Sequence, residues 1–339
     1  MQSIILFILL FVISAPLYAQ EIMPLLAHNS SDSLAPVISV KHFETPIPIG
    51  DTTTKLTVFQ PRGQVDWAKF GISTGVLGVS FLGLHILQNN AWWANQRGTF
   101  HVLPDPTYKD NFDKLGHTFG AYYTAHFFDE MYTWSGFDSG QSTLLGALSG
   151  AMYEFYVEIE DGFARDWGFS PGDAEADILG ATIFVLRNRI DFLRNFQYKW
   201  LYFPSSQFIS GKADIQDQTL NPLDDYGGQT YWITMDVNRM LPETAKGYWP
   251  KWLNLALGFG GWNLDAPPVD NNANPFINRK KAYYLGLDFE IEKIIPESNI
   301  GILNFVRRAL GYWHLPAPAY RISPDPRFFI LFPLRMTIG

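Results

Sequence analysis

The hydrophobic pattern of this 339-residue chain changes its period once, near Asn195. Before that residue, apolar side chains recur at helical spacing; after it, they alternate with polar or small residues at every second position. The alternation covers residues 231–238, 253–260 and 283–292, and we expect a last strand over 328–338. One-faced strands of this kind are typical of antiparallel sheets. The sequence therefore predicts an α+β protein in which helices precede the sheet.

Four stretches before the change suit helices, at residues 70–87, 112–134, 140–161 and 171–195. The start of the fourth is marked by Ser170 as N-cap, Pro171 at the first helical position and Asp173 in the first turn. Because short loops join these stretches, we expect an antiparallel four-helix bundle. One more amphipathic helix is predicted over 299–312, closed by the Pro-rich residues 315–319.

The apolar face of the predicted sheet needs a cover. Four or five strands are too few for the smallest outer-membrane barrels, unless residues 37–59 and 199–210 add strands. We therefore expect the sheet to pack on the helices. The alternative is a partial or complete outer-membrane-type β-barrel associated with the helices.

The first residues have the character of a secretory signal peptide. Residues 1–19 contain a short apolar run that ends in small residues, and an uncleaved anchor is the competing interpretation. We expect residues 20–63, which are rich in Pro, Ser and Thr, to form a flexible leader, although 37–40 and 55–59 each suit a short strand. The remaining chain divides into a helical unit at 64–197 and a strand region at 198–339. We expect an exported protein of the periplasm or outer membrane of a Gram-negative bacterium, with the inner membrane as the alternative.

Composition excludes several classes of function. The chain has no Cys, so it offers no lipid-modified cysteine, disulfide or thiolate metal site. Its net charge of −8 argues against nucleic acid as a partner, and its Gly-rich stretches lie in strand context, so we expect no nucleotide. The aromatic fraction of 16%, with rings at the ends of apolar segments, favours contact with a membrane. Residues 70–87 suit either a membrane helix or a buried helix.

Polar residues interrupt the predicted helices in three places. Pairs of them are four residues apart, so that both members point to the same side of a helix. The candidates for a buried polar cluster are Asp113, Lys114, His117, Glu154, Glu158, Asp161, Arg165, Asp173 and Asp177.

A structural network is the first interpretation of this cluster. Lys114 and Arg165 would neutralise the carboxylates of the second helix, namely Glu154, Glu158 and Asp161, while His117 hydrogen-bonds a carboxylate. Asp173 would act as a helix cap.

The second interpretation is a metal site. Its ligands would be His117, Glu154, Glu158 and Asp177, with Asp113 or Asp161 as an outer residue or general base. A third interpretation is a ligand pocket between helices and sheet, lined by Tyr122, Tyr123, His126, Tyr153 and Tyr156.

The same motifs resemble a known family. Asp-Lys-x-x-His at 113–117, the Glu-bearing helix at 154–161 and the Ser-Pro-Gly-Asp stretch within 169–180 resemble the VanZ-like helical proteins. They are closer still to an uncharacterised bacterial family of predicted periplasmic or outer-membrane proteins (YfiM-like). The resemblance covers about residues 65–195 and implies an envelope location and a compact helical unit, without a reaction.

We therefore expect an uncharacterised envelope protein that acts as a membrane-associated scaffold or binding protein and needs no cofactor. Its partners would be membrane lipid or other envelope proteins. The alternative is a metal-dependent hydrolase that acts on an envelope lipid or cell-wall fragment.

Overall fold

The computed structural model describes residues 64–106, 108–210, 222–262, 264 and 280–334. The predicted signal peptide, the leader and the two short strands considered within it lie outside these residues.

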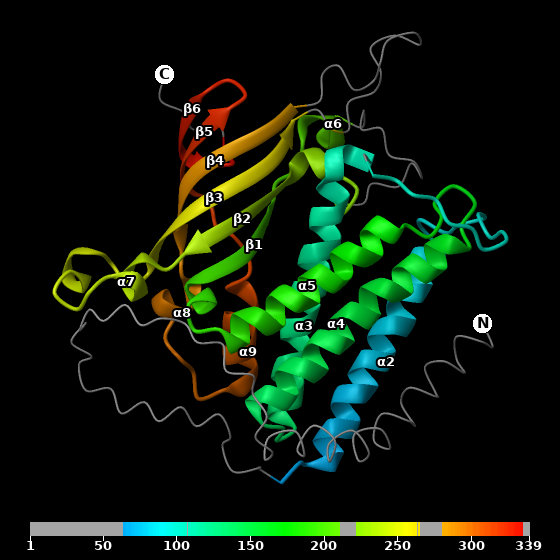
Figure 1. Cartoon of the computed structure of the whole chain (residues 1–339), viewed down its shortest axis with the longest axis horizontal. Coiled ribbons are helices and arrows are strands. Elements are labelled where there is room, and N and C mark those ends of the chain that lie inside the picture. Colours follow the sequence, from blue (N-terminus) through cyan, green and yellow to red (C-terminus); the bar gives the residue numbers. More distant parts are fainter. Residues whose placement is uncertain (1–63, 107, 211–221, 263, 265–279, 335–339) are drawn as a thin grey trace, which may run out of the picture.

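Four long helices form the first part of the described chain (Figure 1). They are α2 (Trp67–Asn89), α3 (Phe112–Trp134), α4 (Ser139–Gly162) and α5 (Pro171–Arg189). Asp66, Asp138 and Ser170 cap α2, α4 and α5, each by accepting a backbone N–H of the first turn. The prediction that the last helix continues to Asn195 is wrong, because Ile190 turns to an extended conformation and starts the approach to the sheet.

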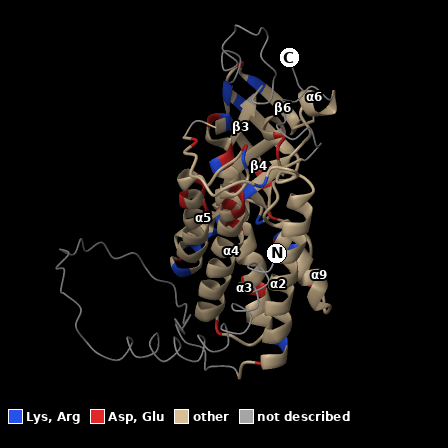
Figure 2. Ribbon diagram, turned by 90° about the vertical axis from the view of Figure 1, so that its right-hand side faces the viewer, with Lys and Arg blue, Asp and Glu red and all other residues tan. Residues whose placement is uncertain are grey.

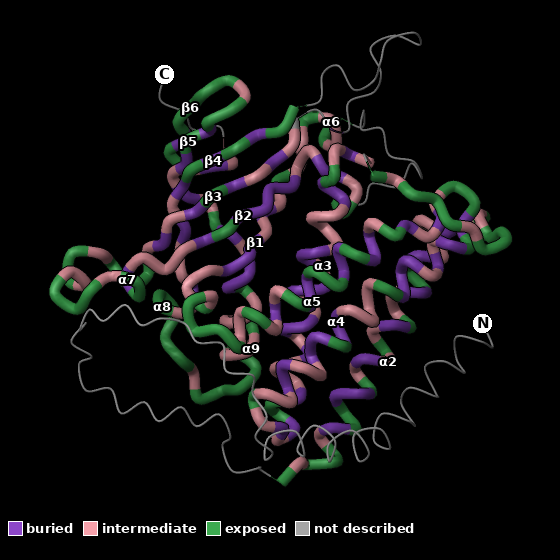
Figure 3. Tube along the Cα trace, in the orientation of Figure 1, coloured by how far each residue is buried: buried purple, intermediate pink, exposed green. Residues whose placement is uncertain are grey.

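Helix α3 lies between the other helices and the sheet (Figure 1). Glycines let its neighbours approach closely. A Cβ atom added at Gly180 of α5 would lie 2.1 Å from the carbonyl oxygen of Thr118, and one added at Gly150 of α4 would lie 2.5 Å from that of Ala121. Buried residues accordingly follow α3 along its length (Figure 3). A regular antiparallel four-helix bundle stays a prediction.

The second part is a six-stranded antiparallel sheet in the order β1-β2-β3-β4-β5-β6. Its strands are β1 (Phe196–Tyr202), β2 (Gln229–Met235), β3 (Leu253–Trp262), β4 (Lys280–Phe289), β5 (Ala317–Ser323) and β6 (Arg327–Phe332). Three short helices, α6 (Ser206–Ile209), α7 (Val237–Met240) and α8 (Ile291–Ile294), and the amphipathic α9 (Gly301–Leu310) lie between strands. The predicted α+β class is confirmed. The described strands form an open sheet, and the barrel alternative is not confirmed.

Four strand predictions need correction. The strands expected over 231–238 and 283–292 end at Met235 and Phe289, because the short helices α7 and α8 begin two residues later. The Pro-rich residues 315–319, expected only to close the preceding helix, include the start of β5, where an irregular register near Ala317 tolerates Pro318. The last strand is β6, which ends at Phe332 rather than at residue 338.

The apolar face of the sheet is covered only in part. At one side, Phe112 of α3 stacks on Phe259 of β3 at 4.8 Å, and the hydroxyl of Tyr198 on β1 donates to the carbonyl of Leu115. Further along, the face is open. The row of directly paired residues on β2 to β6 is 41% to 61% exposed and consists of Ile233, Leu257, Leu285, Tyr320 and Phe328.

The opposite face of the sheet is buried and combines aromatic side chains, among them Trp232, Tyr284 and Phe329, with small and polar ones. It includes Ala256 and Gly258, and it contains an ion pair between Lys199 and Asp288, both fully buried, with Nζ and Oδ2 2.7 Å apart. The expectation that the apolar face of the sheet packs on the helices is therefore correct for β1 and for the end of β3 at Phe259, and wrong for the open row from Ile233 to Phe328.

Candidate functional site

The polar cluster forms where three helix ends meet. Figure 2 shows few charged residues along α2, α3 and α4, and a concentration where the helices approach the sheet. The start of α3 supplies Asp113, Lys114 and His117, the last turns of α4 supply Glu154, Glu158 and Asp161, and the start of α5 supplies Asp173 and Asp177. Spacings of three and four residues direct each set to the same side of its helix.

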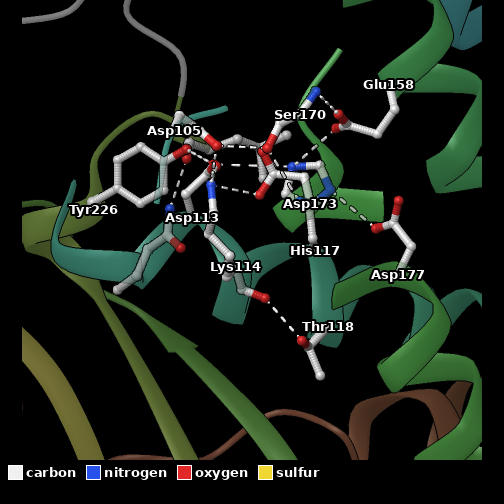
Figure 4. Close-up of polar contacts among 12 residues, drawn as sticks. Asp105, Asp113, Lys114, His117, Thr118, Glu158, Ser170, Asp173, Asp177 and Tyr226 are labelled. Carbon is white, nitrogen blue, oxygen red and sulfur yellow. Dashed lines mark hydrogen bonds and ion pairs between the residues drawn. The ribbon is translucent and has the colours of Figure 1, made fainter. Parts of the chain in front are cut away.

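Lys114 joins three carboxylates (Figure 4). Its Nζ atom lies 2.7 Å from Oδ1 of Asp105, 2.9 Å from Oδ1 of Asp173 and 3.3 Å from Oδ2 of Asp113. Burial opposes the charge of Lys114, but the carboxylates outweigh it and raise the pKa of this ammonium above its usual value. Lys114 is therefore a permanent cation with no capacity left for another carboxylate.

His117 is also surrounded by carboxylates. Its Nδ1 atom lies 3.0 Å from Oδ1 of Asp177, and its Nε2 atom lies 3.6 Å from Oε1 of Glu158 and 4.0 Å from Oδ1 of Asp113 (Figure 4). Burial lowers the pKa of His117, but the hydrogen bond to Asp177 and the surrounding charges raise it well above the usual value. The ring is thus an imidazolium at neutral pH.

Residues from loops and from the sheet region complete the network. The hydroxyl of Tyr226 donates to Oδ1 of Asp113, and that of Ser170 donates to Oδ1 of Asp105. The backbone N–H of Ser170 donates to Oε2 of Glu158 at 3.1 Å. Burial favours the neutral form of Asp113, but His117, Lys114 and Tyr226 together lower its pKa. Asp113 therefore remains ionised.

For other carboxyl groups in the cluster, burial outweighs the compensation from donors and cations. Burial, followed by the charge of Asp177, raises the pKa of Glu154 to about 8, against an opposing effect of His117. Burial raises the pKa of Glu158 to about 9, and those of Asp161 and Asp173 to about 7. The cluster contains more carboxyl groups than its two cations neutralise.

The cluster borders a cavity of about 450 Å³ between the helices and the sheet. Its acidic end is formed by Asp113, His117, Glu154, Glu158, Asp161 and Asp173. Aromatic rings from both layers form much of the remaining wall, among them Trp92, Tyr123, Tyr153, Trp167, Trp200 and Trp313. A molecule inside would meet apolar rings along most of its length and carboxyl groups at one end.

Most of the predicted cluster residues come together, but Arg165 does not. Its guanidinium is exposed and donates to the backbone carbonyl of Asn95. Of the five residues proposed to line a pocket, Tyr123 and Tyr153 do so. The other three, Tyr122, His126 and Tyr156, are buried outside the cavity lining.

The sequence analysis missed three contributors to the site. Asp105 lies in a loop without hydrophobic period, and Tyr226 comes from the strand region, so neither has a pattern that connects it to the helical motifs. Trp93 donates its indole N–H to Asp161. The N-cap role of Ser170 was predicted from its position before Pro171, and the structure adds its contacts with Asp105 and Glu158.

Among the residues that the structure describes, two sets of three side chains have ligand atoms within 4.8 Å of one another and suit a metal ion by geometry. They are Asp113, His117 and Asp173, and His117, Glu158 and Asp177. Asp177 accepts from Nδ1 of His117 and leaves Nε2 directed toward Glu158, as the outer carboxylate of a His–metal centre does. Glu154 belongs to neither set.

Comparison with known proteins connects the cluster to an envelope family. The family described as a predicted periplasmic lipoprotein (DUF2279) matches residues 102–189, which hold α3, α4, α5 and all eight clustered helix residues. No curated protein and no solved structure matches the chain. The match supports an exported cell-envelope protein of the periplasm. The VanZ-like resemblance stays an interpretation, and this chain contains no cysteine to carry a lipid.

Proposed function

We propose that this envelope protein is a membrane-associated binding protein whose cavity holds an amphipathic molecule of the cell envelope. The observation that carries the proposal is the cavity of about 450 Å³ with aromatic walls and one acidic end. Pockets that combine a largely apolar lining with a few converging polar groups are the usual form of small-molecule sites. The apolar part of the ligand would lie against the rings and its polar end against the cluster.

Two exposed apolar surfaces support membrane association. The open row on the sheet, from Ile233 across to Phe328, carries no charge, while the buried side of the same sheet contains the Lys199–Asp288 pair. An exposed row of apolar side chains of this kind is a candidate contact surface for lipid. Helix α2 is the described helix that is long and apolar enough to cross a membrane, by length and composition alone.

The state of His117 favours binding over catalysis. A general base needs a free lone pair near the reacting proton, whereas both nitrogens of the protonated His117 ring face acidic side chains, Asp177 at Nδ1 and Glu158 at Nε2. The arrangement fixes charge in place and suits recognition of a ligand's polar end.

Cavity occupancy tests the proposal. The protein would be purified from its envelope in a detergent-free polymer disc, and bound molecules would be identified by native mass spectrometry. Gly116 lines the cavity, so Gly116→Leu fills part of it, whereas Gly75 of α2 has open space around it and Gly75→Leu serves as the matched control. We expect a bound envelope molecule in the native protein and the control, and its loss in Gly116→Leu. Equal occupancy in all three proteins contradicts the proposal.

A metal-dependent hydrolase is the second candidate, favoured by the orientation of His117 between Asp177 and Glu158. Its test is the metal content of protein purified without chelators. One equivalent of a transition metal, lost in both His117→Ala and Glu158→Gln, would favour the hydrolase over a metal-free binding protein.

A further inference from the structure

We infer that the molecule held in the cavity carries an ammonium group on an apolar chain, and that Glu154 and Glu158 receive this ammonium. The inference rests on the proposed function and names the chemical class of its ligand.

The first argument is the balance of charge. Seven carboxyl side chains belong to the cluster, and they are Asp105, Asp113, Glu154, Glu158, Asp161, Asp173 and Asp177. Among the described residues, Lys114 and His117 are the cations that form ion pairs with them. Lys114 is shared by three carboxylates and His117 is bound most closely by Asp177. With pKa values of about 8 and 9, Glu154 and Glu158 are neutral acids in the empty cavity at neutral pH, and a cationic group from a ligand would allow them to ionise and pair with it.

The second argument is the geometry of the two glutamates. The side chain of Glu158 is only 2% exposed and lines the cavity. Within the described part of the chain, its Oε1 atom has no hydrogen-bond donor, and it lies 3.6 Å from Nε2 of His117. Glu154 lies one turn earlier on α4 and also lines the cavity, and it makes no hydrogen bond or ion pair with the residues that the structure describes. Its carboxylate fits over Gly120, where an added Cβ atom would lie 2.4 Å from Oε1.

The third argument is the wall beside these carboxylates. Tyr123 and Tyr153 line the cavity from α3 and α4, and Trp92 and Trp167 contribute indole rings. The faces of aromatic rings attract organic cations, whereas a bare metal ion requires oxygen or nitrogen ligands on all sides. An alkyl ammonium can contact the faces of the rings and at the same time pair with the carboxylates. An anionic head group would be repelled.

Three small probes of equal chain length test the charge of the ligand: hexylamine, hexanol and hexanoate. Binding to the full-length protein would be measured by quenching of tryptophan fluorescence and by calorimetry. We expect hexylamine to bind at least about tenfold more tightly than hexanol, and hexanoate not to bind. Glu154→Gln should weaken hexylamine binding at least about tenfold and leave hexanol unchanged. Glu175→Gln, on an exposed residue of α5, is the matched control and should change neither.

The outcomes separate this inference from the proposed function. If hexanol and hexylamine bind equally well and Glu154→Gln affects neither, the cavity is an amphiphile site and the ammonium inference is wrong. If none of the probes binds and Gly116→Leu retains as much co-purified material as the native protein, both fail. If Mn²⁺ or Zn²⁺ binds instead, with loss in Glu154→Gln, a metal occupies the site in place of an ammonium. Material that co-purifies with the protein would be extracted and labelled with an amine-reactive tag. Tagged material in the organic phase indicates an amino lipid, and tagged material in the aqueous phase indicates a water-soluble wall fragment.

Discussion

Replacing Glu154 by Gln should stabilise the protein at alkaline pH, although most changes at buried polar positions destabilise. The carboxyl of Glu154 is held among groups from three helices: His117 of α3, Glu158 of α4 and Asp177 of α5. Burial and then Asp177 raise its pKa to about 8 from the usual 4.5. A carboxyl whose pKa is higher in the folded state favours folding less as pH rises. The native protein should therefore lose stability between about pH 4.5 and pH 8 through this group.

The size of the effect follows from the same values. Each pKa unit corresponds to about 1.4 kcal/mol, so a rise from 4.5 to about 8 sets an upper limit near 5 kcal/mol. Partial exposure of Glu154 to the cavity screens its charge, and we expect about 3 kcal/mol above pH 8. In a protein of this size the midpoint of thermal unfolding would rise by about 6 °C. Gln has nearly the same shape, and the substitution removes no hydrogen bond between Glu154 and the described part of the chain.

The assay is thermal unfolding followed by tryptophan fluorescence at pH 5 and pH 9. Glu154→Gln should match the native protein at pH 5 and exceed it at pH 9, while the exposed control Glu175→Gln should match it at both. A variant that is less stable at pH 9, or equally shifted at both values, would refute the view that Glu154 is an uncompensated buried acid.

Three further changes test other parts of the structure. Lys114→Met should lower the free energy of unfolding by about 3 kcal/mol at pH 8, because three carboxylates lose their cation. Adding Asp173→Asn should restore part of this stability in the same thermal assay. An unchanged unfolding midpoint in Lys114→Met would show that the ion pairs contribute nothing to stability. Gly180→Leu should separate α5 from α3, because a Cβ atom at this position would lie 2.1 Å from the carbonyl oxygen of Thr118. Limited proteolysis should then cut within these helices. A variant as resistant to protease as the native protein would contradict the close packing. Leu257→Arg, at a site 61% exposed, should leave the midpoint within about 2 °C but reduce flotation with liposomes, and undiminished flotation would exclude this face as a lipid contact.

The order of helices and strands was predictable because the period of the hydrophobic pattern depends only on neighbouring residues. Helical spacing and alternation can be read from neighbouring residues, and the start of α5 at Pro171 follows from its cap. Which face of the sheet is buried and which is exposed was not predictable from the sequence. Alternation at residues 253–260 shows that Leu257 and Ala256 point to opposite sides, but the sequence does not say which side meets the helices. The structure leaves Leu257 exposed and buries Ala256.

The site was predictable where motifs lie on helices. Spacing placed His117 near the carboxylates of two other helices, and the hydrogen bond with Asp177 joins residues 60 positions apart. The same reasoning misplaced Arg165, because the connector after α4 turns its side chain toward Asn95 and solvent. Asp105 was missed because a loop residue reaches Lys114 through tertiary structure alone. Local patterns therefore give the candidates, while the balance of charge among them requires the fold.

That balance argues against a purely structural role for the cluster. A network that only fixed helix register would gain stability from neutral amides or from matched ion pairs, since buried carboxyls without cations oppose folding. Here Lys114 and His117 already pair with other carboxylates. Three acids with raised pKa values still border the cavity: Glu154, Glu158 and Asp161. Proteins keep such unfavourable groups where a ligand needs them, because interactions that favour binding often cost stability in its absence. If an ammonium ligand binds at Glu154, the same variant that stabilises the empty protein should lose the ligand, and a structural network predicts no such opposition.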